Sequence, residues 1–325
     1  MSEARRLILL AALAAASAAA PLQAVAQGYP SRAITIVVPF PPGGATDIIA
    51  RMLGQKVGDA LKQQVLVDNK AGATGAIGLN HVARSPADGY TLVLATASSL
   101  GTNPAVSKVP FDPVRDFTPI GLLATEPLGL AVHPSIPANS VQELIALARA
   151  KPGALNMASF GTGSVSHLAG ELFSSMAGIK MTHVPYKGAA PATADLMAGQ
   201  VSLMFNSISV FVAPAKSGKL RMLATAGATR SPGLPDLPTV AESGVPGFDA
   251  GTWHALLGPA GLPAEIVGAL SREFGRALKL ADVQEKLAGM SLEPQSATPA
   301  PLAATLQRDA AKWKKIVAET GIKVD

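Results

Sequence analysis

Short apolar runs alternate along the chain with stretches in which apolar residues recur every three or four positions. Residues 34–38 form a β-branched run that predicts a buried strand, and residues 47–62 carry one apolar face at helical spacing. Strands are also predicted at residues 65–67 and 90–94, with a helix at residues 76–83 between them. Strands that alternate with helices favour an α/β fold built from βαβ units, with a parallel sheet.

The same alternation starts again after Pro137. Helices and strands are predicted in turn at residues 141–150, 155–160, 166–176, 181–186, 191–198, 201–205 and 221–226. Beyond a Pro- and Gly-rich stretch, the chain ends with a predicted strand at 253–257 and helices at 263–278, 281–288 and 299–320. A mature chain of about 300 residues exceeds what one core usually supports, so two lobes are expected. We assign residues 27–124 and 254–325 to lobe 1 and residues 125–253 to lobe 2, with crossings near 120–132 and 250–258.

The first 26 residues have the pattern of a secretory signal peptide. Arg5 and Arg6 precede an apolar run from Leu7 to Ala20, and Ala24-Val25-Ala26 offers a cleavage site of small residues. The run is shorter than the roughly 20 residues of a membrane span. The chain has no cysteine, so disulfides, thiolate chemistry and a lipid anchor on cysteine are excluded. We therefore expect a protein that is exported, cleaved near Ala26, free in the periplasm and monomeric.

The charge of the mature chain is mildly positive and scattered. Without Glu3, Arg5 and Arg6, 25 basic and 21 acidic side chains remain, a net charge of +4. Aromatic residues make up 4% of the chain and no basic stripe is present, so no nucleic-acid partner is expected. A positive body is compatible with anionic ligands.

Four loops that each follow a predicted strand are the candidate binding elements. In the first, Phe40 to Asp47, two prolines lack N–H groups and the next backbone donors stand at a helix start, where the helix dipole favours an anion. The alternative is a plain βα turn with solvated amides. The second, Phe160 to His167, adds hydroxyl groups from Thr162 and Ser164, the third runs from Val184 to Pro191, and the fourth is a hydroxyl-rich strand exit at residues 96–99. The candidate ligand-binding residues are Phe40, Gly43, Gly44, Ala45, Thr46, Ser98, Thr162, Gly163, Ser164, Gly188, Ala189, Ala190 and Asn206.

Catalytic and metal chemistry find no support in the sequence. The five histidines, His81, His133, His167, His183 and His254, show no metal-ligand spacing and are read as structural. Gly161-Thr162-Gly163-Ser164 is neither a nucleophile elbow nor a complete dinucleotide fingerprint, because Ser166 stands where the third glycine is needed. No enzyme activity and no cofactor are predicted, and an exported hydrolase is the weakest alternative.

Six sequence strings in order resemble the solute receptors of tripartite tricarboxylate transporters, often called Bug-type receptors. They are Val38-Pro39-Phe40-Pro41-Pro42-Gly43-Gly44, Asp88-Gly89-Tyr90-Thr91-Leu92, Gly161-Thr162-Gly163-Ser164, His183-Val184-Pro185-Tyr186-Lys187-Gly188, Leu237-Pro238-Thr239-Val240-Ala241-Glu242 and Gly258-Pro259-Ala260-Gly261. The resemblance implies a two-lobed periplasmic-binding-protein (Venus-flytrap) architecture, with mixed, mainly parallel sheets flanked by helices. It also implies a receptor that closes on a small di-, tri- or aromatic carboxylate and delivers it to inner-membrane transporter subunits. A receptor that docks to a sensor protein would look the same in sequence.

One departure from the family bears on the ligand. After Leu203-Met204-Phe205 many relatives carry an aspartate, which suits a ligand ammonium group, whereas this chain has Asn206. A neutral amide can donate as well as accept hydrogen bonds. We therefore expect a ligand without a positive amine.

Overall fold

The computed structural model describes residues 28–231 and 233–321. The predicted signal peptide, residues 1–26, lies outside the described residues. The chain divides into two units, Met1–Ser31 and Arg32–Asp325, and the fold belongs to the second unit. Among the residues described, none of the helices has the length and apolar character that a membrane crossing requires.

The first part of this unit is a parallel arrangement of three strands with helices between them. Its elements in chain order are β1 (Ile34–Val38), α2 (Ala45–Leu61), β2 (Val65–Asn69), η1 (Ala73–Gly75), α3 (Ala76–Ala83), β3 (Thr91–Thr96), η2 (Ala97–Thr102) and α4 (Asn103–Val106). Strand β1 lies between β2 and β3 and is parallel to both. Four of its five residues are buried, as the β-branched run predicts.

The second part repeats this arrangement. Its elements are α5 (Val141–Ala150), β5 (Asn156–Ser159), α6 (Val165–Ala177), β6 (Thr182–Pro185), α7 (Ala189–Met197), β7 (Leu203–Ser207), α8 (Ile208–Lys216) and β8 (Arg221–Thr225). Strand β5 is parallel to β6 and β7. The sequence predicts that this helix begins at Pro191. Helix α7 begins at Ala189 instead, so Pro191 is its third residue.

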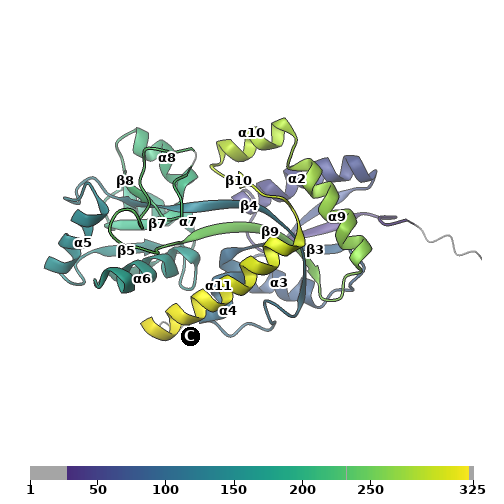
Figure 1. The fold of residues 1–325 in the computed structure, drawn as a ribbon, viewed down its shortest axis with the longest axis horizontal. Helices are drawn as coiled ribbons and strands as arrows, with labels where there is room; N and C mark the ends of the chain where they lie inside the picture. The colour runs from purple at the N-terminus through teal and green to yellow at the C-terminus, as the bar shows by residue number, and fades with distance from the viewer. Residues whose placement is uncertain (1–27, 232, 322–325) are drawn as a thin grey trace, which may run out of the picture. The chain divides into compact units, whose positions relative to one another are not determined.

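Two long antiparallel strands, β4 (Phe117–Val132) and β9 (Gly251–Pro259), connect the parts (Figure 1). The stretch Leu128–Val132 of β4 pairs with β7 and β8, whereas β9 pairs with β3 on its other side. The sequence predicts crossings here, but its pattern does not predict β4 as a strand. Prolines and glycines interrupt its pattern, and register shifts after Pro119 and Leu122 absorb them.

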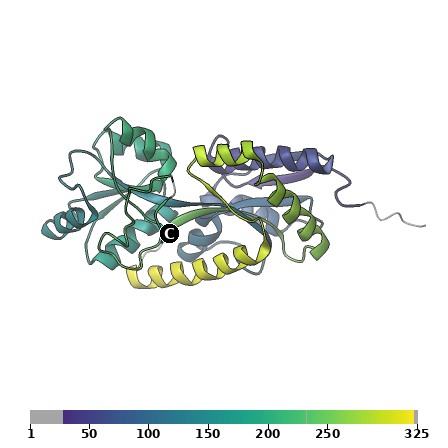
Figure 2. The ribbon, with the colours of Figure 1, turned by 45° about the horizontal axis from the view of Figure 1, so that its top comes forward.

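The last elements of the chain lie along both parts. They are α9 (Ala264–Ala277), α10 (Ala281–Gly289), β10 (Glu293–Pro294) and α11 (Pro299–Thr320). Leu302 and Leu306 of α11 pack in the core of the first part, whereas Trp313 and Ile316 pack in the core of the second. Figures 1 and 2 show this helix running beneath both parts. Helix α11 is therefore a third structural link, in addition to β4 and β9.

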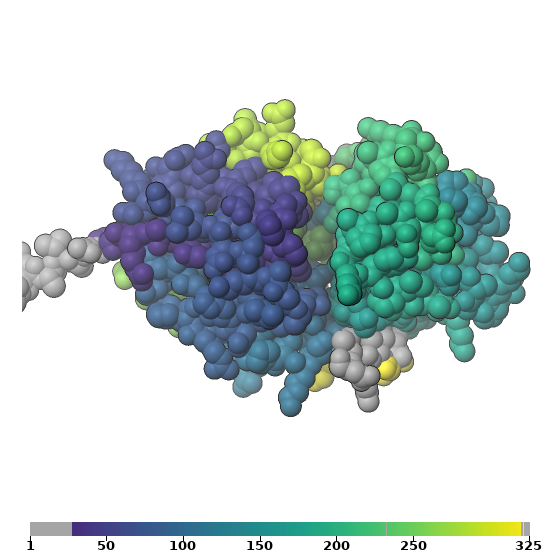
Figure 3. Space-filling model, turned by 180° about the vertical axis from the view of Figure 1, so that it is seen from behind, coloured from purple at the N-terminus to yellow at the C-terminus, as the bar shows by residue number. Residues whose placement is uncertain are grey.

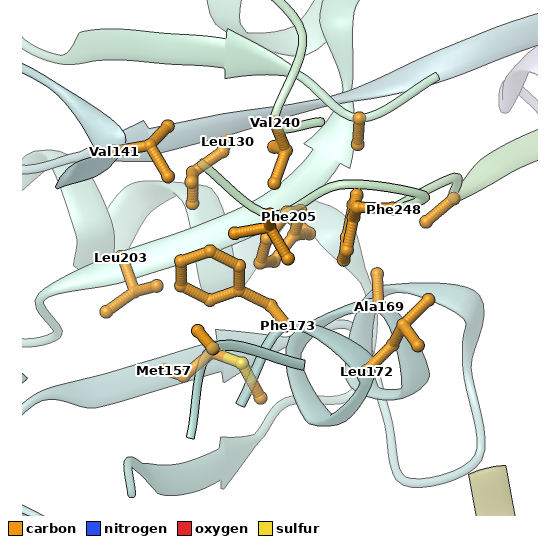
Figure 4. Close-up of a cluster of buried hydrophobic side chains, with 14 of the residues drawn as sticks. Leu130, Val141, Met157, Ala169, Leu172, Phe173, Leu203, Phe205, Val240 and Phe248 are labelled. Carbon is orange, nitrogen blue, oxygen red and sulfur yellow. The ribbon is translucent and has the colours of Figure 1, made fainter. Parts of the chain in front are cut away.

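The core of the second part centres on three phenylalanines (Figure 4). The ring centroids of Phe173 and Phe205 are 5.7 Å apart, and those of Phe205 and Phe248 are 5.8 Å apart. These residues come from α6, from β7 and from the Pro- and Gly-rich stretch before β9. That stretch, which the sequence showed only as loop, is thus anchored in the core and fixes where β9 begins.

Candidate functional site

The candidate site lies where the two parts of the unit face each other. Figure 3 shows a groove between the surface of the first part, in purple and blue, and that of the second, in green. The carboxyl end of a parallel strand is where ligands of α/β sheets bind. The predicted ligand-binding residues lie in the segments after β1 and β3 of the first part, in those after β5 and β6 of the second part, and at Asn206 near the end of β7.

The loop after β1 presents an uncapped helix start. Gly44 is the N-cap of α2, and no side chain caps this helix. Gly43, Gly44 and Ala45 are exposed, and Thr46 is 7% exposed. The first turn of α2 therefore offers backbone N–H groups and the positive end of the helix dipole to an anion.

Gly43 does not offer its amide, contrary to the sequence-based expectation. Its N–H donates to Oδ2 of Asp47 at 3.0 Å, across a backbone with φ of 87° that suits glycine. The free donors of this loop therefore begin after Gly43, at the N-cap and first turn of α2.

The carboxylate of Asp47 is bound by neighbouring side chains. It accepts hydrogen bonds from Arg51 at 3.1 Å and from Asn69 at 3.0 Å. The hydrogen bond from Arg51 is the main reason that the pKa of Asp47 is lowered to about 2. Because Arg51 neutralises this charge, Asp47 leaves the start of α2 favourable to an anion.

The loop after β5 uses most of its polar groups to hold its own shape. Ser164 is the N-cap of α6: its hydroxyl accepts from the amide of His167 and donates to the carbonyl of Gly161 at 2.6 Å. The amide of Gly163 donates to Nδ1 of His167 at 3.2 Å. Gly163 and Ser164, predicted as ligand donors, are thus largely satisfied within the loop. Thr162 is half-buried, and among the described residues its amide and hydroxyl have no hydrogen-bond partner.

Two stacked histidines, His167 and His183, pack against this loop. The rings of His167 and His183 are 3.7 Å apart at an angle of 12°, and Nε2 of His183 lies 2.7 Å from the hydroxyl of Ser159. Burial, and then the neighbouring His167, lower the pKa of His183 to about 4. This ring is therefore neutral at pH 7 and serves the loop as a packing and hydrogen-bonding group.

The residues after β3 touch the loop after β5 directly. The hydroxyl of Ser98 lies 3.4 Å from the amide of Val165, which donates to it, and Thr102 donates to the carbonyl of Gly163 at 2.8 Å. The structure thus joins Ser98 with the second predicted loop. Thr102 was missed by sequence analysis, because the π-helical turn η2 that orients it has no recognised sequence pattern.

The other predicted residues form a separate group in the second part. Asn206 is 2% exposed; its amide donates to Thr193 of α7 at 3.4 Å, and its Oδ1 accepts from the amide of Ser207 at 2.8 Å. Gly188 precedes α7 with φ of 125°, and Ala189 and Ala190 form the first turn. Within the described part of the chain, no hydrogen bond joins this group to the loops after β1 and β5.

A residue outside the prediction, His254, connects β9 to the start of α2. Its Nδ1 lies 3.5 Å from the hydroxyl of Thr46, and the ring is 4% exposed. Burial lowers the pKa of His254 to about 4, so the ring is neutral at pH 7. No sequence pattern indicates this role, because only the pairing of β9 with β3 and β4 brings residue 254 opposite the first loop. Phe40, half-buried, accepts a hydrogen bond from Asn69 through its carbonyl.

Comparison with known proteins decides the family. The model of the tripartite tricarboxylate transporter family receptor matches residues 49–322. The chain belongs to this receptor family. Protein BugT of Bordetella pertussis is 37% identical to this receptor chain over 315 residues, which cover 96% of each protein.

Two solved structures of similar receptors extend this result to the fold. The R. palustris protein Rpa4515, solved with adipate, is 37% identical and superposes with a TM-score of 0.82 over 91% of this chain and 99% of that one. MatC of Rhodopseudomonas palustris, solved with malate, is 33% identical, with a TM-score of 0.79 over 89% of this chain and 100% of that one. The predicted resemblance and the α/β periplasmic-binding-protein fold, a mixed sheet flanked by helices, are confirmed. Receptors of this family are periplasmic solute-binding proteins.

Proposed function

We propose that this receptor captures a small dicarboxylate between its two lobes in the periplasm and delivers it to a membrane transporter. The observation that carries the proposal is the uncapped start of α2, whose residues Gly44 and Ala45 are exposed and whose amides no side chain caps. Two similar receptors were solved with adipate and malate, both small dicarboxylates. The family name supports delivery to a tripartite transporter.

In the proposed site, one carboxylate is held by the amides at the start of α2 and by Thr162. A hydrogen bond to a charged group contributes about 1.5–3 kcal/mol. A dissociation constant near 1 μM requires only about 8 kcal/mol, so three or four such bonds suffice even after the cost of association. Ser98, Gly163 and Ser164 support the loop that carries Thr162.

The proposed lobes follow the two parts of the sheet. Residues 27–124 with 254–325, and residues 125–253, would move about the strands β4 and β9. Because α11 packs into both cores, closure around a ligand would pivot where β4, β9 and α11 pass between the two parts. No catalytic step and no cofactor belong to the proposed function.

Ligand identification by mass spectrometry after denaturing the purified protein, followed by calorimetry, tests the proposal. Malate, adipate and aspartate are the probes, and we expect malate and adipate to bind and aspartate, which carries an ammonium group beside its two carboxylates, to bind more weakly. Thr162→Val should weaken dicarboxylate binding about tenfold through the lost hydroxyl hydrogen bond. The matched control is Thr182→Val in β6, whose exposed hydroxyl bonds only to the carbonyl of Gly153. Failure of both dicarboxylates to bind would refute the proposal.

A further inference from the structure

A buried carboxyl group, Glu126, lies in β4 where this strand runs from one part of the sheet to the other. Glu126 is 2% exposed to solvent. Oε1 accepts hydrogen bonds from the amide of Ser209 at 3.2 Å and from its hydroxyl at 3.1 Å. No salt bridge is formed by Glu126 within the described residues. A buried carboxyl without a positive partner is rare, because burial disfavours its charge.

The register of β4 against β9 shows which way Glu126 faces. Glu126 is opposite Thr252, and Ala124 is opposite His254, so Glu126 and His254 are on one face of this strand pair. Trp253 is on the other face, since its ring N–H donates to Asp309 of α11 at 2.7 Å. Glu126 and His254 therefore share the face of the strand pair that is turned away from α11.

Both candidate halves of the binding site meet this face. His254 lies 3.5 Å from Thr46 at the start of α2, in the first part. Glu126 bonds to Ser209 at the start of α8, three residues after Asn206 in the second part. The face thus forms a floor between the loop after β1 and the start of α8, with a neutral histidine at one end and a carboxyl at the other.

The surroundings of Glu126 compensate its charge only in part. Burial raises its pKa to about 7, and hydrogen bonds from Ser207, Ile208 and Ser209 oppose this effect incompletely. The titratable groups on the elements packed along β4 are His254 of β9, Glu293 of β10, Lys216 of α8, Arg221 of β8, Glu265, Arg272, Glu273 and Arg276 of α9, and Arg308, Asp309, Lys312, Lys314, Lys315 and Glu319 of α11. Of these, Arg308, Asp309, Lys312 and Glu293 line a hollow with Thr125 and Trp253 of the opposite face and with Thr252, which is paired with Glu126.

We propose that Glu126 is the proton-uptake site of this receptor: when an anionic solute binds over the floor, each Glu126 that is ionised takes up one proton from solvent. This inference rests on the proposed function. The proton adds to the Glu126 carboxylate and gives the neutral acid, so that one negative charge is lost beside the incoming anion. Two like charges in a partly desolvated site repel, and the repulsion shifts the carboxyl toward its protonated form. Glu126 thereby links affinity for an anion to pH.

Proton uptake is measured by titrating the full-length mature protein with malate in several buffers at pH 7. The buffers differ in their ionisation enthalpy, and the slope of the observed enthalpy against that enthalpy counts the protons exchanged. About half a proton should be taken up per malate, because half of the Glu126 groups are already protonated near their pKa. Glu126→Gln should bind malate with a slope near zero. The control variant Glu285→Gln, at an exposed position of α10, should keep the wild-type slope.

The pH dependence of affinity in the wild-type protein gives a second measurement, which does not need the variant to fold. Both carboxyl groups of malate are ionised throughout pH 6–8, so the ligand itself contributes no change. The dissociation constant should rise about tenfold from pH 6 to pH 8, as Glu126 loses its proton in the free protein. A slope of zero in the wild type, an unchanged slope in Glu126→Gln, or a constant affinity over this range would each overturn the inference. If neither malate nor adipate binds at any pH, the proposed function fails as well.

Discussion

Asp47, Ser164 and His167 direct their polar atoms into the loops that carry them. Asp47 accepts a hydrogen bond from the amide of Gly43, and His167 accepts one from the amide of Gly163. The Ser164 hydroxyl caps α6. Preorganisation of this kind lowers the cost of ordering a loop when a ligand binds. The three residues therefore act on affinity through loop shape, and substitutions there should change stability together with binding.

Ser164→Ala separates these two effects when it is compared with a second cap. The loss of an N-cap destabilises a protein by about 1 kcal/mol, and the released loop should also weaken malate binding several-fold. Ser140→Ala removes the comparable cap of α5, whose hydroxyl accepts from the amide of Glu143 at 3.1 Å. Urea unfolding and calorimetry on both variants should show similar losses of stability, with a loss of affinity for Ser164→Ala alone. Equal affinity losses would mean that the loop plays no specific part in binding.

Asn206→Asp tests the expected ligand class. A carboxylate at this buried position repels a dicarboxylate and attracts an ammonium group, since the position is 2% exposed and poorly screened. Calorimetry should show at least about tenfold weaker binding of malate and a gain for aspartate. Asn139→Asp, at an exposed position before α5, should leave both affinities unchanged. Stronger malate binding in Asn206→Asp would contradict the role given to Asn206.

At the scale of elements, most helices and strands follow from the apolar pattern. The helices Ala76–Ala83 and Pro299–Thr320 begin and end at their predicted residues, because one face of each is regularly apolar. The sequence does not predict strand β4, because its first part pairs with β9 and its last part pairs with β7. No single alternation of apolar and polar residues therefore runs along the whole strand. In the candidate site, the loops could be predicted from glycines and prolines at strand ends. The use of their amides could not, because it depends on side chains such as Asp47 and His167 that fold back on them.

Glu126→Gln should remove the loss of folding stability that ionisation of the buried Glu126 carboxyl causes as the pH rises. The pKa of Glu126 is about 7 in the folded protein and 4.5 in the unfolded chain, so the unfolded chain ionises first as the pH rises. Its contribution to stability therefore falls between about pH 4.5 and pH 7, by about 3 kcal/mol in all. Urea unfolding measures the free energy of unfolding of the variant minus that of the wild type. This difference should be about 3 kcal/mol more in favour of the variant at pH 8 than at pH 4.5. The same difference at both pH values would show that the carboxyl is not buried, and Glu285→Gln serves as the control.

At the scale of the molecule, three segments tie the two parts together: β4, β9 and α11. The first two carry the floor of the candidate site, and the third packs Leu302 into one core and Trp313 into the other. A closing motion must therefore pivot where β4, β9 and α11 pass side by side. This shared packing also predicts that neither part unfolds alone.

Trp313→Ala tests the shared packing. Trp313 is 1% exposed, and removal of a large buried side chain costs about 3–5 kcal/mol. We expect urea unfolding, followed by circular dichroism, to show one transition in the wild type and one in the variant, at lower urea concentration. Leu280→Ala, at a position that is 42% exposed, should change the midpoint little. Two separate transitions in the wild type would show that α11 does not couple the parts.

The position of α11 also makes tryptophan fluorescence sensitive to movement between the two parts. The chain contains two tryptophans, Trp253 and Trp313, and both lie in segments that join the two parts. Trp253 donates to Asp309 at 2.7 Å, and the ammonium group of Lys312 lies 4.4 Å from the centre of the Trp313 ring. Any pivot that slides α11 against β9 changes the polar surroundings of both indoles. Intrinsic fluorescence should therefore register solute capture in the unlabelled protein, in real time and without a dye.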